Sequence, residues 1–467
     1  MTDWASAAAA ITRRYRLDKW VYPPEALPLV GAARAEPLPL PMRVEMFWRR
    51  ENFQSVIPMN LFSLKRLKLA LDVPALETAL KLLVARHEPL RSELLMVEGN
   101  PAQRIRSDYQ PKLEILDLSS LDAAGRGAEE AQLMLGFALQ KIDLFAGPTF
   151  RVRLLRLSDN EFVLGILLHH YFGDAKSLGA IFNELLSLYA SVLGKEVGPL
   201  AELRWCYADY ALWQRNFAAP RLAEYLGYWE QRLADVPWLG LSPQGEADAR
   251  RSGMFSFLVP KDLSARLGET ARHAKTTLFA VTLAAYQLAL SEFSGKRDVV
   301  TAIPVAARAR RDFANTVGYL MNALPVRTHI EPSAGVAEHL KIFGQKLMAD
   351  YFRQDISYEL LEDALPGPQP LSTNMFNFIP ANFKRPESNF GEDAVVDYTH
   401  PLFEAEMRQQ PRVRVMKDFV FFLTETQQGL DGLLLYNRDY FDEVRMREFA
   451  ARFTAQLERI AAAAPAF

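Results

Sequence analysis

The stretch ILLHHYFGDAKSLG, residues 166–179, places two histidines at the end of an apolar run and an aspartate four residues after the second. Upstream, the segment FRVRLLRLSDNEFVLGILLHH predicts two strands joined by a turn at residues 158–160, and the second strand is so apolar that we expect it to be buried on both faces. Downstream, LGAIFNELLSLYASVLG carries apolar residues at helical spacing. The quoted stretch is therefore predicted to lie where a buried strand gives way to a helix.

The adjacent histidines point to acid–base chemistry, because the unperturbed pKa of histidine is about 6.5. Successive residues of a strand face opposite sides, so His169 and His170 cannot both face one site and one of them is expected to be structural. Gly173 would allow a close backbone approach, and the amides that open the helix could stabilise developing negative charge. Asp174 could pair with a cation and fix the turn. The simpler alternative is a set of ordinary residues at a strand end.

Composition and spacing argue against several classes of protein. The chain has 467 residues and a formal net charge of -2, which predicts two or three domains and gives no reason to expect a nucleic acid partner. The single cysteine, Cys206, fits a reducing compartment. Because we find no secretory signal and no apolar stretch long enough for a bilayer, we expect a cytoplasmic protein without a membrane partner. No metal site is expected, because the remaining histidines show no ligand spacing: His87, His273, His329, His339 and His400.

The distribution of proline, glycine and polar stretches along the sequence predicts four parts. An alanine-rich and proline-studded extension covers residues 1–36, and a first lobe covers 37–240. A polar linker with glycine and proline, residues 241–253, precedes a second lobe, 254–467. The second lobe restarts with a strand, a polar turn and a helix, as the first one does. We therefore expect an α/β (α+β) protein made of two lobes of related design.

The sequence HHYFGDA matches the signature H-H-x-x-x-D-G of condensation domains of nonribosomal peptide synthesis, except that Ala175 replaces the final glycine. Across residues 38–460 the chain resembles these domains, which belong to the superfamily of acyltransferases with the chloramphenicol acetyltransferase fold. The resemblance also rests on six collinear blocks: ARHEPLRSEL (85–94), DLFAGPTFRVRLLRL (143–157), YADYALWQ (207–214), IPVAARAR (303–310), VGYLMNALPVR (317–327) and LYNRDYFD (435–442).

The resemblance implies two chloramphenicol acetyltransferase-like lobes in a V-shaped pseudo-dimer, with a tunnel between them. It implies catalytic residues His170, His169 and Asp174, of which His170 acts as the base or positions the nucleophile, and the role of His169 is less settled. Asp174 is expected to be structural and to pair with Arg308, with Arg91 as the reserve partner. A glycine with positive φ at position 175 would be costly to replace by alanine, so Ala175 leaves the local turn open. Tyr171 and Asn322 are candidates for lining the tunnel, although Asn322 could instead cap a turn.

The function implied by the resemblance is acyl transfer. The acyl chain would come from a phosphopantetheine thioester on an acyl or peptidyl carrier protein acting in trans, because the chain has no carrier motif of its own. A small-molecule or carrier-bound amine or hydroxyl would accept it, forming an amide or ester without a resident cofactor. We expect a free-standing monomer that releases chains in natural product biosynthesis, such as that of an antibiotic. Carrier proteins are commonly acidic, so Arg308, Arg310 and Arg311, or Arg13 and Arg14, could steer one toward the site, unless they are a solvated charged face.

Three alternatives stay open at this point. A related acyltransferase would take its acyl group from coenzyme A. A catalytically silent module would only recruit carriers or other partners, although retention of His170 favours catalysis. Epimerisation also remains possible, because epimerase domains share the signature.

Overall fold

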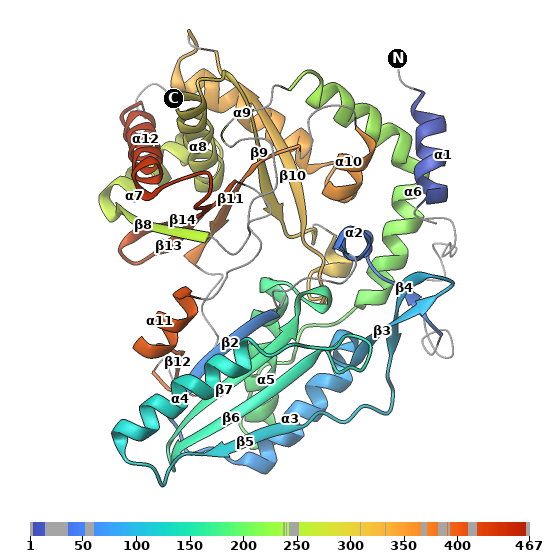
Figure 1. The fold of residues 1–467 in the computed structure, drawn as a ribbon, viewed down its shortest axis with the longest axis vertical. Coiled ribbons are helices and arrows are strands. Elements are labelled where there is room, and N and C mark those ends of the chain that lie inside the picture. Colours follow the sequence, from blue (N-terminus) through green and yellow to red (C-terminus); the bar gives the residue numbers. More distant parts are fainter. Residues whose placement is uncertain are drawn as a thin grey trace.

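A computed structural model of the chain describes residues 3–14, 36–51, 60–236, 239, 241, 252–308, 310–331, 333–365, 371–381, 390, 393–409 and 418–463. The described elements form two lobes, drawn one above the other in Figure 1, each built on a mixed sheet covered by helices. The mixed α/β class agrees with the expectation from the sequence.

The first lobe, at the bottom of Figure 1, contains a five-stranded sheet in the order β12-β2-β7-β6-β5. Its strands are β2 (Asn60–Leu67), β5 (Leu113–Asp117), β6 (Phe150–Ser158), β7 (Glu161–His169) and β12 (Val395–Asp397). Helices α4 (Ala123–Ala138) and α11 (Pro401–Gln409) cover one face, and α3 (Val73–Arg86) and α5 (Ala175–Val192) cover the other.

Neighbouring residues of β2 show the two covered faces directly. The Lys65 ammonium lies over the Phe182 ring of α5, whereas Arg66 pairs with Glu130 of α4. The central strand β7 is buried from residue 162 to residue 168, which confirms the prediction of a strand buried on both faces. Its apolar run is therefore explained by position in the sheet.

The second lobe contains a six-stranded sheet in the order β10-β9-β11-β13-β14-β8. Its strands are β8 (Ser252–Pro260), β9 (Asp298–Val305), β10 (Asn322–His329), β11 (Asn374–Ile379), β13 (Phe419–Thr426) and β14 (Gly429–Asn437). Strand β11 pairs in parallel with β9 and β13, and the other pairings are antiparallel. Helices α7 (Lys261–His273), α8 (Leu278–Ser294), α9 (Val336–Tyr351) and α12 (Glu443–Ala462) pack against this sheet and one another.

Smaller elements join the lobes. A three-stranded sheet is formed by β1 (Leu38–Pro39), β3 (Ser92–Val97) and β4 (Asn100–Ile105). The long helix α6 (Tyr207–Leu233) runs from the first lobe along the second, next to α2 (Met42–Glu51) and α10 (Tyr358–Ala364) (Figure 1). Helix α1 (Trp4–Arg14) packs on α6, where the Trp4 Nε1–H donates to Glu230 at 2.7 Å. Part of the expected docking extension is therefore packed against this chain itself, and residues 15–35 of it lie outside the described part.

The expected boundary between lobes is crossed in both directions. Strand β12 comes from the second half of the chain but pairs with β2 in the first-lobe sheet, and α11 follows it onto α4. Conversely, Met42 and Met46 of α2 and Trp229 of α6 lie in the hydrophobic core of the second lobe. The division 37–240 and 254–467 was therefore wrong as a division of cores, because each half of the chain completes the core of the other. Residues 242–251 of the expected linker lie outside the described residues.

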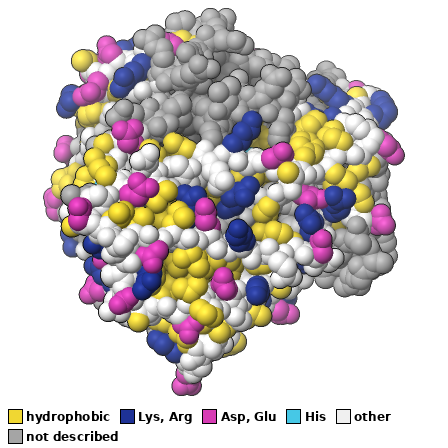
Figure 2. All heavy atoms as spheres, turned by 60° about the horizontal axis from the view of Figure 1, so that its bottom comes forward, with side chains coloured by type: hydrophobic (Ala, Val, Ile, Leu, Met, Phe, Trp, Pro, Cys, Tyr) yellow, Lys and Arg dark blue, Asp and Glu magenta, His cyan; other side chains and the backbone are white. Residues whose placement is uncertain are grey.

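The surface and helices carry two further observations. Acidic and basic side chains are interspersed over the face drawn in Figure 2, which belongs to the lower end of the molecule. Within the described part of the chain, we find no helix with the length and apolar character needed to cross a bilayer.

Candidate active site

The two histidines lie at the junction between β7 and α5, as the sequence predicts. Strand β7 ends at His169, residues His170–Phe172 form a short 3-10 turn, and Asp174 is the N-cap of α5. The Asp174 carboxylate accepts the Ser177 backbone N–H at 2.9 Å, the capping bond that makes aspartate a favoured residue at this position. That bond occupies the Ser177 amide, so this amide cannot also stabilise negative charge on a substrate.

His170 is oriented by its own turn. Its Nδ1–H donates to the Gly173 carbonyl oxygen at 2.8 Å, so the neutral ring carries its lone pair on Nε2. The edge-to-face partner of the ring is Tyr319, with ring centroids 4.8 Å apart and an interplanar angle of 85°. Burial lowers the pKa of His170, and the nearby charge of Arg43 adds to this effect, while the Gly173 carbonyl and the Asp174 carboxylate oppose it. A lowered pKa keeps the ring neutral at physiological pH, which is the form a general base requires.

His169 is used differently. Its Nδ1 accepts the Tyr171 backbone N–H at 3.2 Å, so the neutral ring carries its proton on Nε2. Burial, and then the charge of His170, lower the pKa of His169 to about 3. The side chain thus caps the 3-10 turn, a structural role of the kind expected for one member of the pair.

Asp174 forms the expected ion pair with Arg308 across the lobes. The guanidinium donates to the two carboxylate oxygens at 2.7 and 3.0 Å, and both side chains are almost fully buried. Burial alone would raise the pKa of Asp174, but the Arg308 charge and hydrogen bonds hold it below the ordinary value. The Arg308 guanidinium also donates to the Gly318 carbonyl at 3.2 Å, which ties the start of α5 to the loop before β10. The reserve partner Arg91 instead donates to the Arg106 carbonyl at 3.0 Å.

Gly173 and Ala175 fit the turn for reasons of space. Gly173 is extended, with φ -167°, but a Cβ there would lie 2.2 Å from Cδ2 of Leu168. Its lack of a side chain therefore leaves room for the Leu168 side chain, and a close approach of this backbone to a substrate stays a prediction. Ala175 is the first residue of α5 and does not adopt a positive φ, so alanine causes no backbone strain at this position.

Neither candidate for tunnel lining is among the wall residues of the cavity described below. The Tyr171 side chain is 3% exposed and packs in the first-lobe core, and its place in the tunnel wall stays a prediction. Asn322 takes the alternative role that the sequence left open. Its Nδ2 group donates to the carbonyls of Gln354 and Ile356 at 2.7 and 2.6 Å, so it holds the turn before α10.

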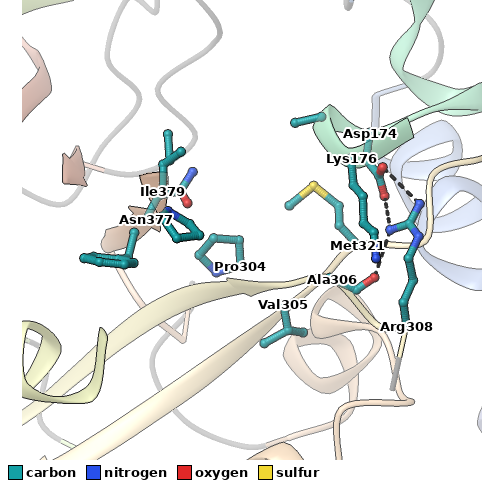
Figure 3. A pocket seen from close by; sticks show the side chains of 12 residues that line it. Asp174, Lys176, Pro304, Val305, Ala306, Arg308, Met321, Asn377 and Ile379 are labelled. Atoms are coloured by element: carbon teal, nitrogen blue, oxygen red, sulfur yellow. Dashed lines mark hydrogen bonds and ion pairs between the residues drawn. The ribbon is translucent and has the colours of Figure 1, made fainter. Parts of the chain in front are cut away.

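A cavity of about 240 Å³ lies between the start of α5 and the second-lobe sheet (Figure 3). Its walls come from α5, the end of β9, the loop before β10, and β11 with the residue after it: Asp174, Ala175, Lys176, Pro304, Val305, Ala306, Arg308, Met321, Asn377, Phe378, Ile379 and Pro380. The cavity adjoins the His170 turn, because Asp174 caps the helix that follows this turn and Met321 is two residues from Tyr319.

Three residues near the site were missed from the sequence. Lys176 lines the cavity, and Tyr319 contacts His170. Arg43 of α2 lies 5.7 Å from the Tyr319 ring, and its Nε–H donates to Glu359 at 3.1 Å. Lys176 and Tyr319 stand inside quoted blocks and could have been found there. Arg43 gave no local signal, because the partner Glu359 is 316 residues away.

The arginines considered for carrier steering are not equivalent. Arg308 is wrong for that role, because its guanidinium is buried in the ion pair with Asp174. Arg310 is exposed and pairs with Asp312 at 3.2 Å, and Arg311 is exposed beside it. Arg13 and Arg14 are exposed in the last turn of α1. Among the described residues, no group of three or more His, Cys, Asp or Glu side chains is placed to hold a metal ion.

The family model and the similar curated proteins agree on one family. A family model described as "Condensation domain" matches residues 51–466. One of the linear gramicidin synthase proteins of Brevibacillus parabrevis is 31% identical over 441 residues, and the match covers 92% of this chain but only 8% of that protein.

Solved structures share the fold. The SgcC5 protein of Streptomyces globisporus, in complex with (R)-(-)-1-(2-naphthyl)-1,2-ethanediol and sucrose, is 25% identical with a TM-score of 0.65, and the match covers 87% of this chain and 93% of that one. The X-domain in its complex with OxyB, from teicoplanin biosynthesis, is 23% identical with a TM-score of 0.73, over 92% of this chain and 95% of that one.

Proposed function

Because the chain belongs to the condensation domain family, we propose that it transfers an acyl group from a carrier-protein phosphopantetheine thioester to an amine or a hydroxyl. The carrier arrives on another chain, and the transfer releases a finished chain as an amide or an ester. Hydroxyl acceptors are included because the similar SgcC5 protein was solved with a diol. The proposal depends on one observation, the orientation of His170.

The geometry of His170 supports general-base catalysis. The Nδ1–H bond to the Gly173 carbonyl leaves Nε2 unprotonated, and the lowered pKa keeps it so at neutral pH. As the acceptor attacks the thioester carbonyl, Nε2 removes its proton. The new C–N or C–O bond forms, the C–S bond breaks, and the proton passes to the leaving thiol. Asp174 does not take part in proton transfer but fixes the start of α5 through Arg308.

The experiment that tests this function is a transfer assay with an acyl-loaded carrier and a matched amine and alcohol as acceptors. We expect a new product, detected by its intact mass, whose formation needs the carrier, the acceptor and His170. Equal rates from the carrier and from the same acyl group on coenzyme A would favour the coenzyme A branch. Carrier binding without any product from the wild-type protein would favour the silent recruiting module, and an unchanged mass with an inverted stereocentre would favour epimerisation.

A further inference from the structure

Lys176 gives the cavity an unbalanced positive charge. The cavity walls contain three charged side chains, and two of them, Asp174 and Arg308, neutralise each other in their ion pair. The third, Lys176, extends along the cavity wall toward Ala306 (Figure 3). No hydrogen bond or ion pair of its ammonium is found in the part of the chain that the structure describes.

The surroundings of Lys176 disfavour a bare cation. Burial lowers the pKa of Lys176, and the Arg308 charge lowers it further, while Asp174 opposes the shift. Lys176 is nevertheless an exposed residue, so its burial is partial and water still reaches it when no ligand is bound. An anion bound in the cavity would offset both unfavourable effects.

The rest of the wall suits a small molecule with one polar end. Phe376 is buried in the second-lobe core, so strand alternation puts its neighbour Asn377 on the opposite face of β11. The amide of Asn377 therefore adds a second polar group to the cavity. Apolar side chains, including Met321 and Ile379, form much of the remaining wall. Such a lining is typical of sites in which few polar groups orient a ligand and apolar surface holds it.

We propose that this cavity binds the acceptor and that Lys176 recognises a carboxylate on it. The inference rests on the proposed function and names the substrate class: a small amine or alcohol that also carries one carboxylate. The ammonium of Lys176 takes the carboxylate, Asn377 orients it, and the nucleophile points toward the His170 turn.

Two arguments favour a carboxylate on the acceptor over other anions. A carrier delivers the acyl donor on a tether and so raises its local concentration, whereas an untethered acceptor must be held by its own contacts. One ammonium and one amide match a monoanion, while phosphate groups are usually bound by arginine or by several backbone N–H groups. The phosphate of phosphopantetheine is therefore the weaker candidate.

The test is a binding measurement that needs no carrier. The binding of 3-(aminomethyl)benzoate and of 3-(aminomethyl)benzamide, which has an amide in place of the carboxylate, is measured by titration calorimetry on the full chain. We expect the wild-type protein to prefer the benzoate about tenfold, the size of one charged hydrogen bond in a half-open site. The variant Lys176→Met should lose this preference and Lys176→Arg should keep most of it. The control Lys341→Met, an exposed lysine of α9, should leave it unchanged.

Several outcomes would overturn the inference: no benzoate binding to the wild-type protein, no preference over the amide, or an equal preference in Lys176→Met with an unchanged melting temperature. Stronger competition by inorganic phosphate than by acetate would assign the lysine to phosphate instead. Transfer assays with the same two acceptors separate this inference from the proposed function. Selective binding of the benzoate without any transfer would contradict the proposed acyl transfer but support the carboxylate site. Transfer to both acceptors without a preference for the carboxylate would contradict the site but support acyl transfer.

Discussion

Replacing Asp174 by asparagine tests whether the inter-lobe ion pair is structural. The change keeps the shape of the side chain but leaves the Arg308 guanidinium, 2% exposed, without its counter-charge. Breaking a buried pair in this way costs about 3 to 5 kcal/mol. At about 2.1 cal/mol/K of unfolding entropy per residue, a chain of 467 residues that unfolds as one unit would lose about 3 to 5 °C in Tm. If one lobe unfolds alone, the loss is about twice as large.

The assay is thermal unfolding of the full chain, with transfer activity measured beside it. Asp312→Asn is the matched control, because the Arg310–Asp312 pair is partly exposed and should contribute at most about 1 kcal/mol. The pH dependence has a definite sign. The pKa of Asp174 is depressed in the folded protein, so the pair stabilises above the unfolded pKa of about 3.9 and this stability is lost as pH falls through the folded value. The difference in Tm between wild type and Asp174→Asn should therefore shrink in acid. An unchanged Tm with lost activity would refute the structural role and make Asp174 a direct participant in catalysis.

Three further predictions concern the chemistry. His170→Ala should fold with the wild-type Tm and lose about 10²- to 10⁴-fold in kcat, and near-wild-type turnover would remove His170 as the base. Arg43→Met should raise the apparent pKa on the acidic side of the pH profile of kcat/KM, because a positive charge near His170 is lost. Glu359→Gln should lower the same apparent pKa, because the charge of Arg43 is then left without its carboxylate partner. Shifts in the same direction, or none, would make the pair purely structural. The same acyl group should transfer with a higher kcat/KM from its carrier than from coenzyme A. If exposed arginines steer the carrier, added salt should reduce this difference in kcat/KM. Equal kcat/KM values for the two donors would contradict carrier recognition.

Local patterns predicted the elements around the site well. The strand β7 and the helix α5 follow directly from the apolar run and the helical spacing on either side of the two histidines. Helix α3 likewise has a local sequence signal: Asp72 is its N-cap, and Leu76, Leu80 and Leu83 are buried at helical spacing. These features depend on neighbours in sequence, which is why a single chain reveals them.

Distant contacts were not accessible in the same way. The pairing of Asp174 with Arg308 came from the resemblance, since 134 residues separate them and no local pattern joins them. The burial of Tyr171 in the first-lobe core could not be predicted, because proximity to the histidines does not fix the direction of a side chain in a 3-10 turn. Asn322 could not be assigned because its partners lie beyond a whole strand and helix. Strand β12 is three residues long, too short for its alternation to be recognised.

The return of β12 to the first-lobe sheet has a consequence for protein engineering. Recombining this chain with a relative at the apparent midpoint would graft a foreign edge strand onto β2, together with a foreign α11 against α4. The same cut would separate Met42, Met46 and Trp229 from the second-lobe core they help to fill. Crossover points for functional hybrids should therefore keep residues 395–409 with the first half of the chain, and keep α2 and the end of α6 with the second. The two halves of the chain exchange segments, so no single breakpoint in the sequence divides it into two independent modules.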